Sequence, residues 1–288
     1  MAKNKKKRKI IQKPEFTAQD LPATRFLQFF DIFKIEWRNL TKLGLLTLVF
    51  LIPFFVVYFL MLYFASNAGD NPILIISLGY VGLYLTLFVV AVHLSGMGNV
   101  LKKMIYGEGV LFKDDYFEGI KKNYGQFAII TAVYGLIYLI IDFSCKYIFG
   151  FEGIVPIIFS AICTGFLFLL LTPIVLTIVS ECSMYEIKLK SAIKNSLILV
   201  VSRFWQYLVV GLILLAMNLV FAIPNFLILL LVASLIALLV MPLIALAILL
   251  ISTSSFDVLI NKDSFPELYK KGLKKEGNEL WWFVLKRQ

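Results

Sequence analysis

The feature that most constrains this chain is a series of long apolar stretches with almost no charged residues inside them. A helix needs about 20 mostly apolar residues to cross a bilayer, and six segments meet that requirement: 43–65, 72–96, 126–149, 153–180, 206–223 and 225–256. With 60% hydrophobic and 16% charged residues, the chain carries more apolar surface than a water-soluble core could bury. The sequence therefore predicts an all-α polytopic membrane protein whose six transmembrane helices form three hairpins.

Lysine and arginine residues lie almost entirely on one side of these six segments. Of the 28 basic residues, only Lys146 falls in a connection on the other side. Because Lys and Arg accumulate in cytoplasmic connections, both termini and the 97–125 and 181–205 intervals are predicted to be cytoplasmic. The net charge of +10 is then expected to attract anionic lipid headgroups rather than nucleic acid.

The chain divides into three parts on this pattern. Residues 1–24 are predicted to form a basic, disordered cytoplasmic tail, and residues 25–260 the six-helix transmembrane domain. Residues 261–288 are predicted to form an amphipathic cytoplasmic segment, in which Phe265 to Gly272 has the pattern of a further entry helix. Trp281, Trp282 and Phe283 then offer an anchor at the membrane interface.

A basic residue followed by asparagine precedes the first, third and fifth predicted spans. In the first copy, Phe26, Phe30, Phe33 and Trp37 recur at helical spacing, as in a helix lying at the interface. We therefore predict a short cytoplasmic interfacial helix before each hairpin, with chance periodicity in a Phe- and Leu-rich chain as the alternative. The candidate interfacial or partner-docking residues are Trp37, Arg38, Asn39, Phe117, Lys121, Lys122, Asn123, Lys194 and Asn195.

Few polar residues fall at membrane depth, and none has the spacing of a known catalytic or metal-binding motif. His93, the single histidine, and Asn218 are candidates for a solute pathway or for hydrogen bonds between helices. Pro173 and Pro242 occupy comparable places in the fourth and sixth spans, an arrangement found at transporter sites. Templates for a metal site, a nucleophile elbow and a phosphate loop are all unmatched. The sequence accordingly predicts no enzyme activity and no cofactor.

The longest charged interval, Gly107 to Phe127, contains an acidic trio of Asp114, Asp115 and Glu118. These carboxylates could hold a cation. The interpretation that we favour is that acids in the first turn of a helix complement its dipole. Three cysteines, Cys145, Cys163 and Cys182, lie at different expected depths, so no disulfide is predicted.

Several motifs resemble the YesL-like family of bacterial integral membrane proteins. The central one runs from Gly96 to Lys103 and continues through Gly107, Glu108, Phe112, Asp114, Phe117 and Gly119 to Asn123. Supporting stretches are 30–39, 172–179, 189–195 and 204–207, so the resemblance covers about residues 25–215. The lysine-rich N-terminal tail and the extension after the sixth span depart from the family pattern.

This resemblance implies a multi-pass protein of the bacterial plasma membrane. Members of the family are often encoded beside carbohydrate-uptake transporters, and the family carries no recognised catalytic residues. The first expectation is therefore a non-enzymatic accessory or regulatory component linked to carbohydrate uptake, with a membrane transporter complex as its partner. The alternative is a small transporter or channel for a neutral solute, with His93, Asn218, Pro173 and Pro242 near its path.

Overall fold

A computed structural model describes residues 21–67, 69, 72–148, 153–223 and 225–274. Across these residues the regular structure is helical and no strand occurs. Six helical segments are long and apolar enough to cross a membrane: Arg25–Ser66, Pro72–Ile105, Phe112–Tyr147, Ile154–Met184, Phe204–Phe221 and Phe226–Asn261. The prediction of an all-α protein with six membrane-spanning segments is confirmed.

Three of these segments are nearly continuous helices, and three are built from shorter pieces. The first three are α1 (Arg25–Ser66), α2 (Pro72–Ile105) and α3 (Phe112–Phe143), the last extended by η2 (Ser144–Ile148). The other elements, in chain order, are α4 (Ile154–Phe166), η3 (Leu167–Leu171), α5 (Thr172–Met184), α6 (Leu189–Ser202), α7 (Phe204–Asn218), η4 (Leu219–Ala222), α8 (Phe226–Leu235), η5 (Ile236–Val240), α9 (Met241–Phe256), η6 (Asp257–Asn261) and α10 (Lys262–Ser264).

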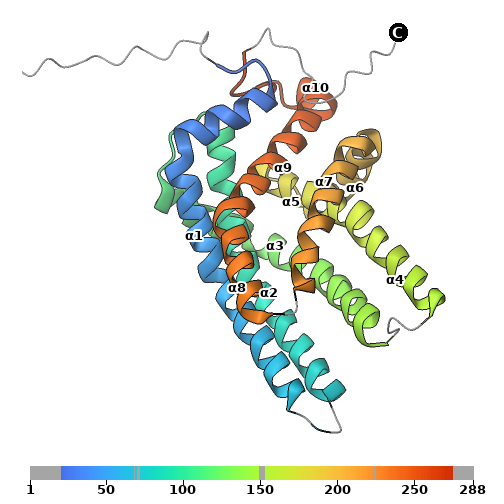
Figure 1. Cartoon of the computed structure of the whole chain (residues 1–288). Helices are drawn as coiled ribbons and strands as arrows, with labels where there is room; N and C mark the ends of the chain where they lie inside the picture. Colours follow the sequence, from blue (N-terminus) through green and yellow to red (C-terminus); the bar gives the residue numbers. More distant parts are fainter. Residues whose placement is uncertain (1–20, 68, 70–71, 149–152, 224, 275–288) are drawn as a thin grey trace, which may run out of the picture.

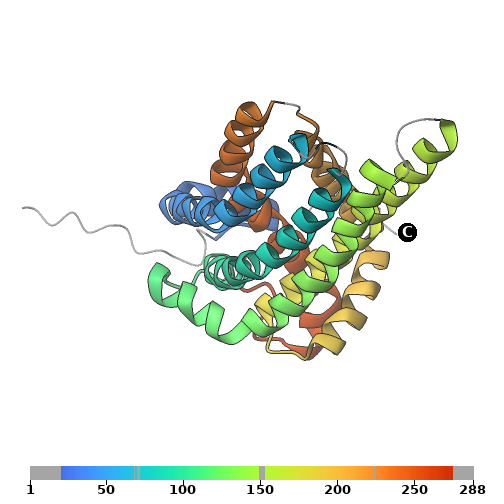
Figure 2. The same cartoon turned by 90° about the horizontal axis from the view of Figure 1, so that it is seen from below.

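The helices pack into a bundle in which the fifth and sixth segments have different neighbours. α2 lies between α1 and α3 and contacts both along much of its length, while α7 packs on η3. η5 and α9 pack instead on α1. Figure 1 shows the C-terminal part of α1 and the N-terminal part of α2 running side by side and extending below the other helices, and Figure 2 shows the same pair from below. Many large apolar side chains on the outside are exposed, such as Leu227 at 74% and Ile73 at 61%. An apolar outer surface of this kind is expected where lipid is the solvent.

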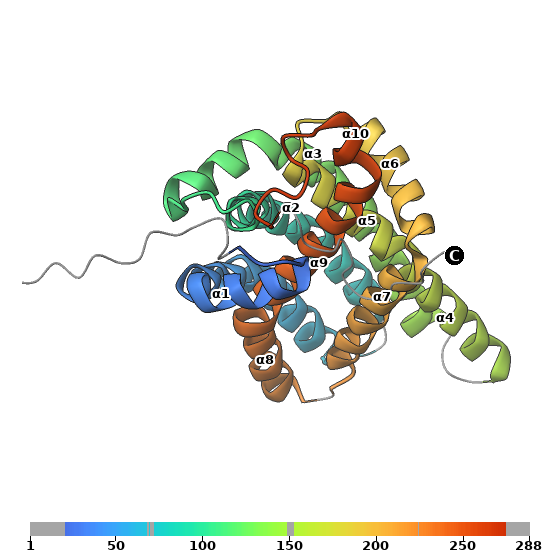
Figure 3. The same ribbon diagram turned by 90° about the horizontal axis from the view of Figure 1, so that it is seen from above.

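One end of the bundle, here called the basic end, brings together segments that are far apart in the sequence. It contains the start of α1, the α2–α3 and α5–α6 connections, α10 and the segment after it, as seen from above in Figure 3. The opposite end holds the connections around residues 67–72, 148–154 and 223–226. The main core cluster lies toward the basic end and includes Leu43, Leu101 and Phe256, all fully buried.

A π-helical segment precedes the proline in each of the fourth and sixth membrane-spanning segments. Pro173 and Pro242 each follow a five-residue π-helix, η3 and η5 respectively. A proline has no N–H to donate and its ring crowds the carbonyl four residues earlier, so the preceding turn widens. Thr172 compensates in the fourth segment, since its hydroxyl donates to the Leu167 carbonyl at 2.8 Å.

The predicted interfacial helices take two different forms. In α1 the amphipathic part runs directly into the span, with one bend at Glu36 (φ −105°, ψ 15°). The second copy is likewise the first turns of α3, whereas the third is the separate helix α6, divided from α7 at Arg203. The aromatic face of α1 is exposed as expected for an interface, with Trp37 at 54%.

The C-terminal expectation of another entry helix over Phe265 to Gly272 is wrong. Beyond the three-residue α10, the chain forms successive turns, with Leu268 N–H donating to Phe265 O and Lys271 N–H to Leu268 O. Lys270 and Gly272 both have positive φ, at 52° and 83°, which a continuing helix does not allow. Residues 1–20 of the tail predicted over residues 1–24 lie outside the described residues, as does the aromatic anchor at 281–283.

Candidate functional site at the basic end

A cleft of about 500 Å³ opens at the basic end between four separate parts of the chain. Its walls come from the end of α2 with the following connection, the first turns of α3, the α5–α6 connection, and the segment from Phe265 to Lys271. This volume lies within the range of small-ligand sites, roughly 300–1,000 Å³. Much of the family-like motif from Gly96 to Asn123 therefore forms one side of a hollow rather than an isolated loop.

The motif glycines explain how α2 and α3 come together beside this cleft. A Cβ atom at Gly119 would lie 2.7 Å from the Ser95 carbonyl oxygen, and one at Gly96 would lie 2.6 Å from the Tyr116 ring. Neither position has room for a side chain. Asn99 then crosses the contact, donating from Nδ2 to the Asp115 carbonyl at 2.7 Å. The spacing of the motif thus corresponds to close helix packing.

The acidic trio in α3 has split roles. Asp115 is buried, and its carboxylate accepts from the Leu111 backbone N–H at 2.7 Å and pairs with Lys103. Glu118 pairs with Lys122 at 2.9 Å and Lys103 at 3.6 Å. Asp115 therefore caps the start of α3, as the dipole interpretation anticipated.

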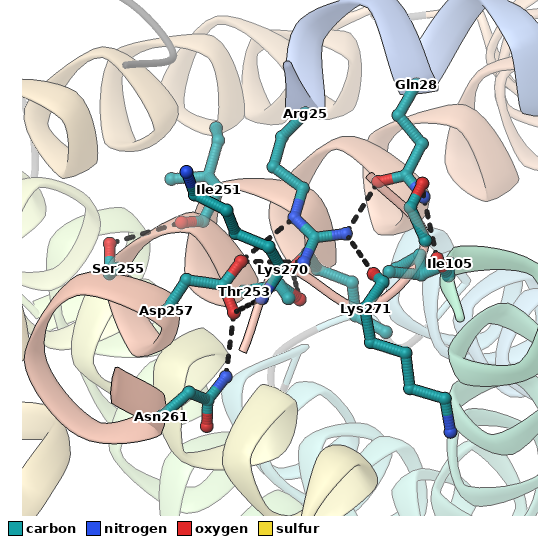
Figure 4. Close-up of polar contacts among 12 residues, drawn as sticks. Arg25, Gln28, Ile105, Ile251, Thr253, Ser255, Asp257, Asn261, Lys270 and Lys271 are labelled. Atoms are coloured by element: carbon teal, nitrogen blue, oxygen red, sulfur yellow. Dashed lines mark hydrogen bonds and ion pairs between the residues drawn. The ribbon is translucent and has the colours of Figure 1, made fainter. Parts of the chain in front are cut away.

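A buried hydrogen-bond network at the basic end, here called the polar clasp, links the first and the last parts of the described chain (Figure 4). Arg25, at the start of α1, donates to the Asp257 carboxylate from Nη2 at 2.6 Å and from Nε at 3.2 Å. Its Nη1 donates to Gln28 Oε1 at 2.7 Å and to the Lys271 carbonyl at 3.0 Å. Gln28 in turn donates to the Ile105 carbonyl at 2.6 Å, beside the cleft. The clasp so fixes the segment after α10 against α1 and α2.

The second carboxylate oxygen of Asp257 completes the clasp. It accepts from Asn261 Nδ2 at 2.8 Å and from the Lys270 backbone N–H at 3.2 Å. Tyr185, which follows α5, donates to Asn261 at 2.6 Å. Both side chains of the central ion pair are buried, at 3% exposure for Arg25 and 6% for Asp257. Sequence reasoning missed this pair because its partners are 232 positions apart.

His93 is held inside the bundle by two hydrogen bonds. Its Nε2 lies 2.8 Å from Thr47 Oγ1, and its Nδ1 lies 3.0 Å from the Tyr116 hydroxyl. The Thr47 hydroxyl already donates to the Leu43 carbonyl, so it accepts from His93 Nε2–H and leaves Nδ1 to accept from Tyr116. With Phe50 stacked on its ring, His93 acts as a structural link between α1, α2 and α3.

Substituting Tyr116 with phenylalanine is expected to cost about 1–2 kcal/mol of stability, because a buried imidazole acceptor loses its donor. Unfolding in mixed micelles with increasing SDS would measure the change. Tyr124 to phenylalanine, at a partly exposed position on the same helix, serves as the control. Equal midpoints for the two variants would contradict this account of His93.

Asn218 belongs to a different cluster near the opposite end. It accepts from the Tyr138 hydroxyl at 2.7 Å, while Tyr80 donates to Asp142 at 2.6 Å and Lys146 pairs with Asp142 at 2.9 Å. These residues come from α2, α3, η2 and α7. His93 and Asn218 therefore bond to different partners on different helices and do not share one polar site. The contact between Tyr80 and Asp142 was not anticipated from the sequence.

The predicted docking residues are spread over the basic end. Trp37, Arg38, Phe117, Lys121, Lys122 and Lys194 are exposed, and of these Lys122 lines the cleft. The three asparagines of the repeat have unlike surroundings. Asn39 donates to Glu36 at 2.6 Å, Asn123 is half-buried, and Asn195 lies close to the Glu181 carboxyl. The repeat therefore does not mark a shared side-chain contact.

Glu181 is a buried acid within the fourth membrane-spanning segment. It is fully buried near the end of α5, and neither carboxylate oxygen has a hydrogen-bond partner among the described residues. Burial of a carboxyl group without hydrogen-bond partners is costly, so Glu181 is expected to lower the stability of this part of the bundle.

Comparison with known proteins adds no relative to this picture: no family model, no curated protein and no solved structure matches the chain. The resemblance to the YesL-like family accordingly stays a prediction that rests on the motifs quoted above.

Proposed function

We propose that this chain is a bacterial plasma-membrane protein that serves as a non-enzymatic accessory or regulatory component of another membrane system. In this proposal the basic end faces the cytoplasm, where the Lys and Arg residues of its connections are expected to remain. The YesL-like motifs support carbohydrate uptake as the system that it serves.

The observation that carries the proposal is the construction of the basic end. Four parts of the chain surround an open cleft. The polar clasp and ion pairs such as Lys271–Glu108, at 2.7 Å, hold them in place. A fixed surface assembled from distant segments suits the binding of another molecule, since little conformational freedom is lost on association. At membrane depth, by contrast, His93 and Asn218 are engaged in hydrogen bonds with neighbouring helices.

Isolation of the tagged full chain from its native membranes after mild crosslinking tests this proposal. A partner of discrete mass is expected to accompany the wild-type chain and to be lost from a Lys122→Glu variant that still inserts. Lys122 is exposed at the edge of the cleft, where reversing its charge should oppose docking. Recovery of the chain alone, or equal recovery of the partner with the variant, would argue against docking at this end.

A small transporter for a neutral solute is the second candidate, and one observation favours it. The Tyr138–Asn218 and Tyr80–Asp142 contacts place hydroxyl, amide and carboxylate groups together between three helices near the opposite end. Flux into reconstituted vesicles that falls in an Asn218→Leu variant, with retained folding, would support transport. If no flux is found, or if the flux is the same in the Asn218→Leu variant, the transporter hypothesis is rejected.

A further inference from the structure

The cleft contains one lysine whose charge no acidic side chain balances directly. Lys103, Lys122 and Lys271 each form an ion pair, with Asp115, Glu118 and Glu108 respectively. Lys102 lines the same cleft and is half-buried, yet it has no ion pair within the described ranges. Two acids interact with Lys102 electrostatically from a longer distance, Glu108 and Glu186. Each lies within ion-pair distance of another lysine: Glu108 of Lys271 and Glu186 of Lys122.

A second unpaired group lies one helical turn along from Lys102. Tyr106 forms part of the cleft wall with only 5% of its surface exposed, and its hydroxyl is enclosed and has no hydrogen-bond partner in the part of the chain that the structure describes, so a ligand reaches it only if the wall opens slightly. Burial raises the pKa of Tyr106, so the hydroxyl keeps its proton and remains a donor. Residues four apart on a helix are neighbours, and the Tyr106 backbone N–H still bonds to the Lys102 carbonyl at 3.0 Å.

These two groups call for a ligand that is both negative and rich in acceptor oxygens. A phosphate group meets both needs, because lysine binds phosphate as a point charge while other oxygens remain free to accept. The ammonium of Lys271 lies 4.8 Å from the centre of the Tyr106 ring and adds positive potential on the same side. Glu108 is paired with Lys271, and Lys122 lies within ion-pair distance of both Glu118 and Glu186, which weakens the repulsion between these three glutamates and an anion. Glu267 also lines the cleft and has no ion pair among the described residues, so Lys102 has to outweigh its charge.

The position along α2 places Lys102 just beyond the zone of the lipid headgroups. Lys102 lies six residues beyond Gly96, where the apolar stretch of α2 ends, or about 9 Å along the helix axis. The polar headgroup zone extends roughly 5–8 Å from the hydrocarbon on each side, and a lysine side chain can reach back toward it.

We infer that the cleft is a phosphate-binding site in which Lys102 and Tyr106 hold the phosphate of an anionic phospholipid headgroup. This inference concerns the purified protein alone and does not depend on the proposed partner. A soluble phosphate compound offers the same chemistry, so the experiment has to separate the two sources.

Native mass spectrometry of the full chain in detergent, with added dioleoylphosphatidylglycerol or dioleoylphosphatidylcholine, is the test. The fraction of protein that retains phosphatidylglycerol is expected to fall about tenfold in Lys102→Ala, since a charge-assisted hydrogen bond is lost. Lys190→Ala, an exposed lysine on α6 outside the cleft, should bind as the wild type does. Phosphatidylcholine should discriminate less between the variants because its headgroup carries no net charge.

Inorganic phosphate and glycerol 3-phosphate form the second arm. Lipid retention that resists millimolar amounts of both identifies the headgroup, while displacement that disappears in Lys102→Ala identifies a soluble phosphate in the same site. Equal lipid retention and equal displacement in Lys102→Ala and Lys190→Ala would overturn the inference. So would a Lys102→Ala chain that keeps the lipid but loses a protein partner, because the cleft would then recognise an acidic protein segment.

A second pair of variants decides the case in which Lys102→Ala does not fold. Lys102→Arg keeps the positive charge and should retain the lipid, whereas Tyr106→Phe removes only the hydroxyl and should weaken retention several-fold. Wild-type retention in Tyr106→Phe together with loss in Lys102→Arg would contradict the assigned roles.

Discussion

Replacement of Asp257 by alanine is expected to lower the free energy of unfolding by about 3–5 kcal/mol, which would make it the most destabilising single substitution at the basic end. The change leaves the Arg25 guanidinium charged and buried at 3% exposure without its carboxylate. It also removes the acceptor for Asn261 and for the Lys270 backbone N–H. Unfolding in mixed micelles with increasing SDS, followed by tryptophan fluorescence, would measure the loss.

Two further variants make this test specific to the buried pair. Asp114→Ala, an exposed aspartate on α3, should change stability by less than about 0.5 kcal/mol. The double variant Arg25→Met with Asp257→Leu should be less destabilised than Asp257→Ala, because no unpaired charge remains. If Asp257→Ala unfolds like Asp114→Ala, the clasp does not hold the basic end together.

Substitution of Gly44 by leucine is expected to cost at least about 3 kcal/mol and to separate the first and sixth segments. Even a Cβ atom at this position would lie 1.9 Å from the Leu238 carbonyl oxygen. That atom belongs to the backbone of η5 and cannot turn aside as a flexible side chain could. The same unfolding assay would detect the loss, and a cysteine pair placed across α1 and η5 should crosslink less in the variant.

Gly165 provides the matched control for this substitution. It lies in α4, and no atom is within 4 Å of the position that its Cβ would occupy. Gly165→Leu is therefore expected to be neutral or slightly stabilising, since glycine inside a helix is unfavourable by about 1 kcal/mol. Similar losses in both glycine variants would show that close packing at Gly44 is not the cause.

The six membrane-spanning segments could be predicted because hydropathy reports directly on the solvent around a helix. The π-helical turns before Pro173 and Pro242 have a local cause, since proline disrupts the turn that precedes it. Segment ends were less accurate: the sixth segment was expected to end at residue 256, but helix continues through η6 to Asn261. A charged residue such as Asp257 is normally taken to mark the end of a membrane-spanning segment. Here Arg25 pairs with Asp257, so the helix can continue inside the protein.

The site was predictable only in part, and for the same physical reason. Hydropathy and helical spacing drew attention to the interval from Gly107 to Phe127, but they could not bring it beside Tyr185 or Lys271, which lie on other parts of the chain. The turns after α10 depend on hydrogen bonds that the Arg25 and Gln28 side chains donate to the Lys271 and Gly272 backbone carbonyls. Helical periodicity over Phe265 to Gly272 therefore gave the wrong local structure, because tertiary contacts overrode it.

Site-specific photocrosslinking in native membranes tests the central claim, docking at the basic end, most directly. A photoreactive residue at Glu186, whose side chain is 88% exposed at the cleft, should give a crosslinked protein of discrete mass. The same residue at Asn67, exposed at the opposite end, should not give this product. A product at Glu186 alone is the predicted result, whereas no product at Glu186, or the same product at both positions, would contradict the account.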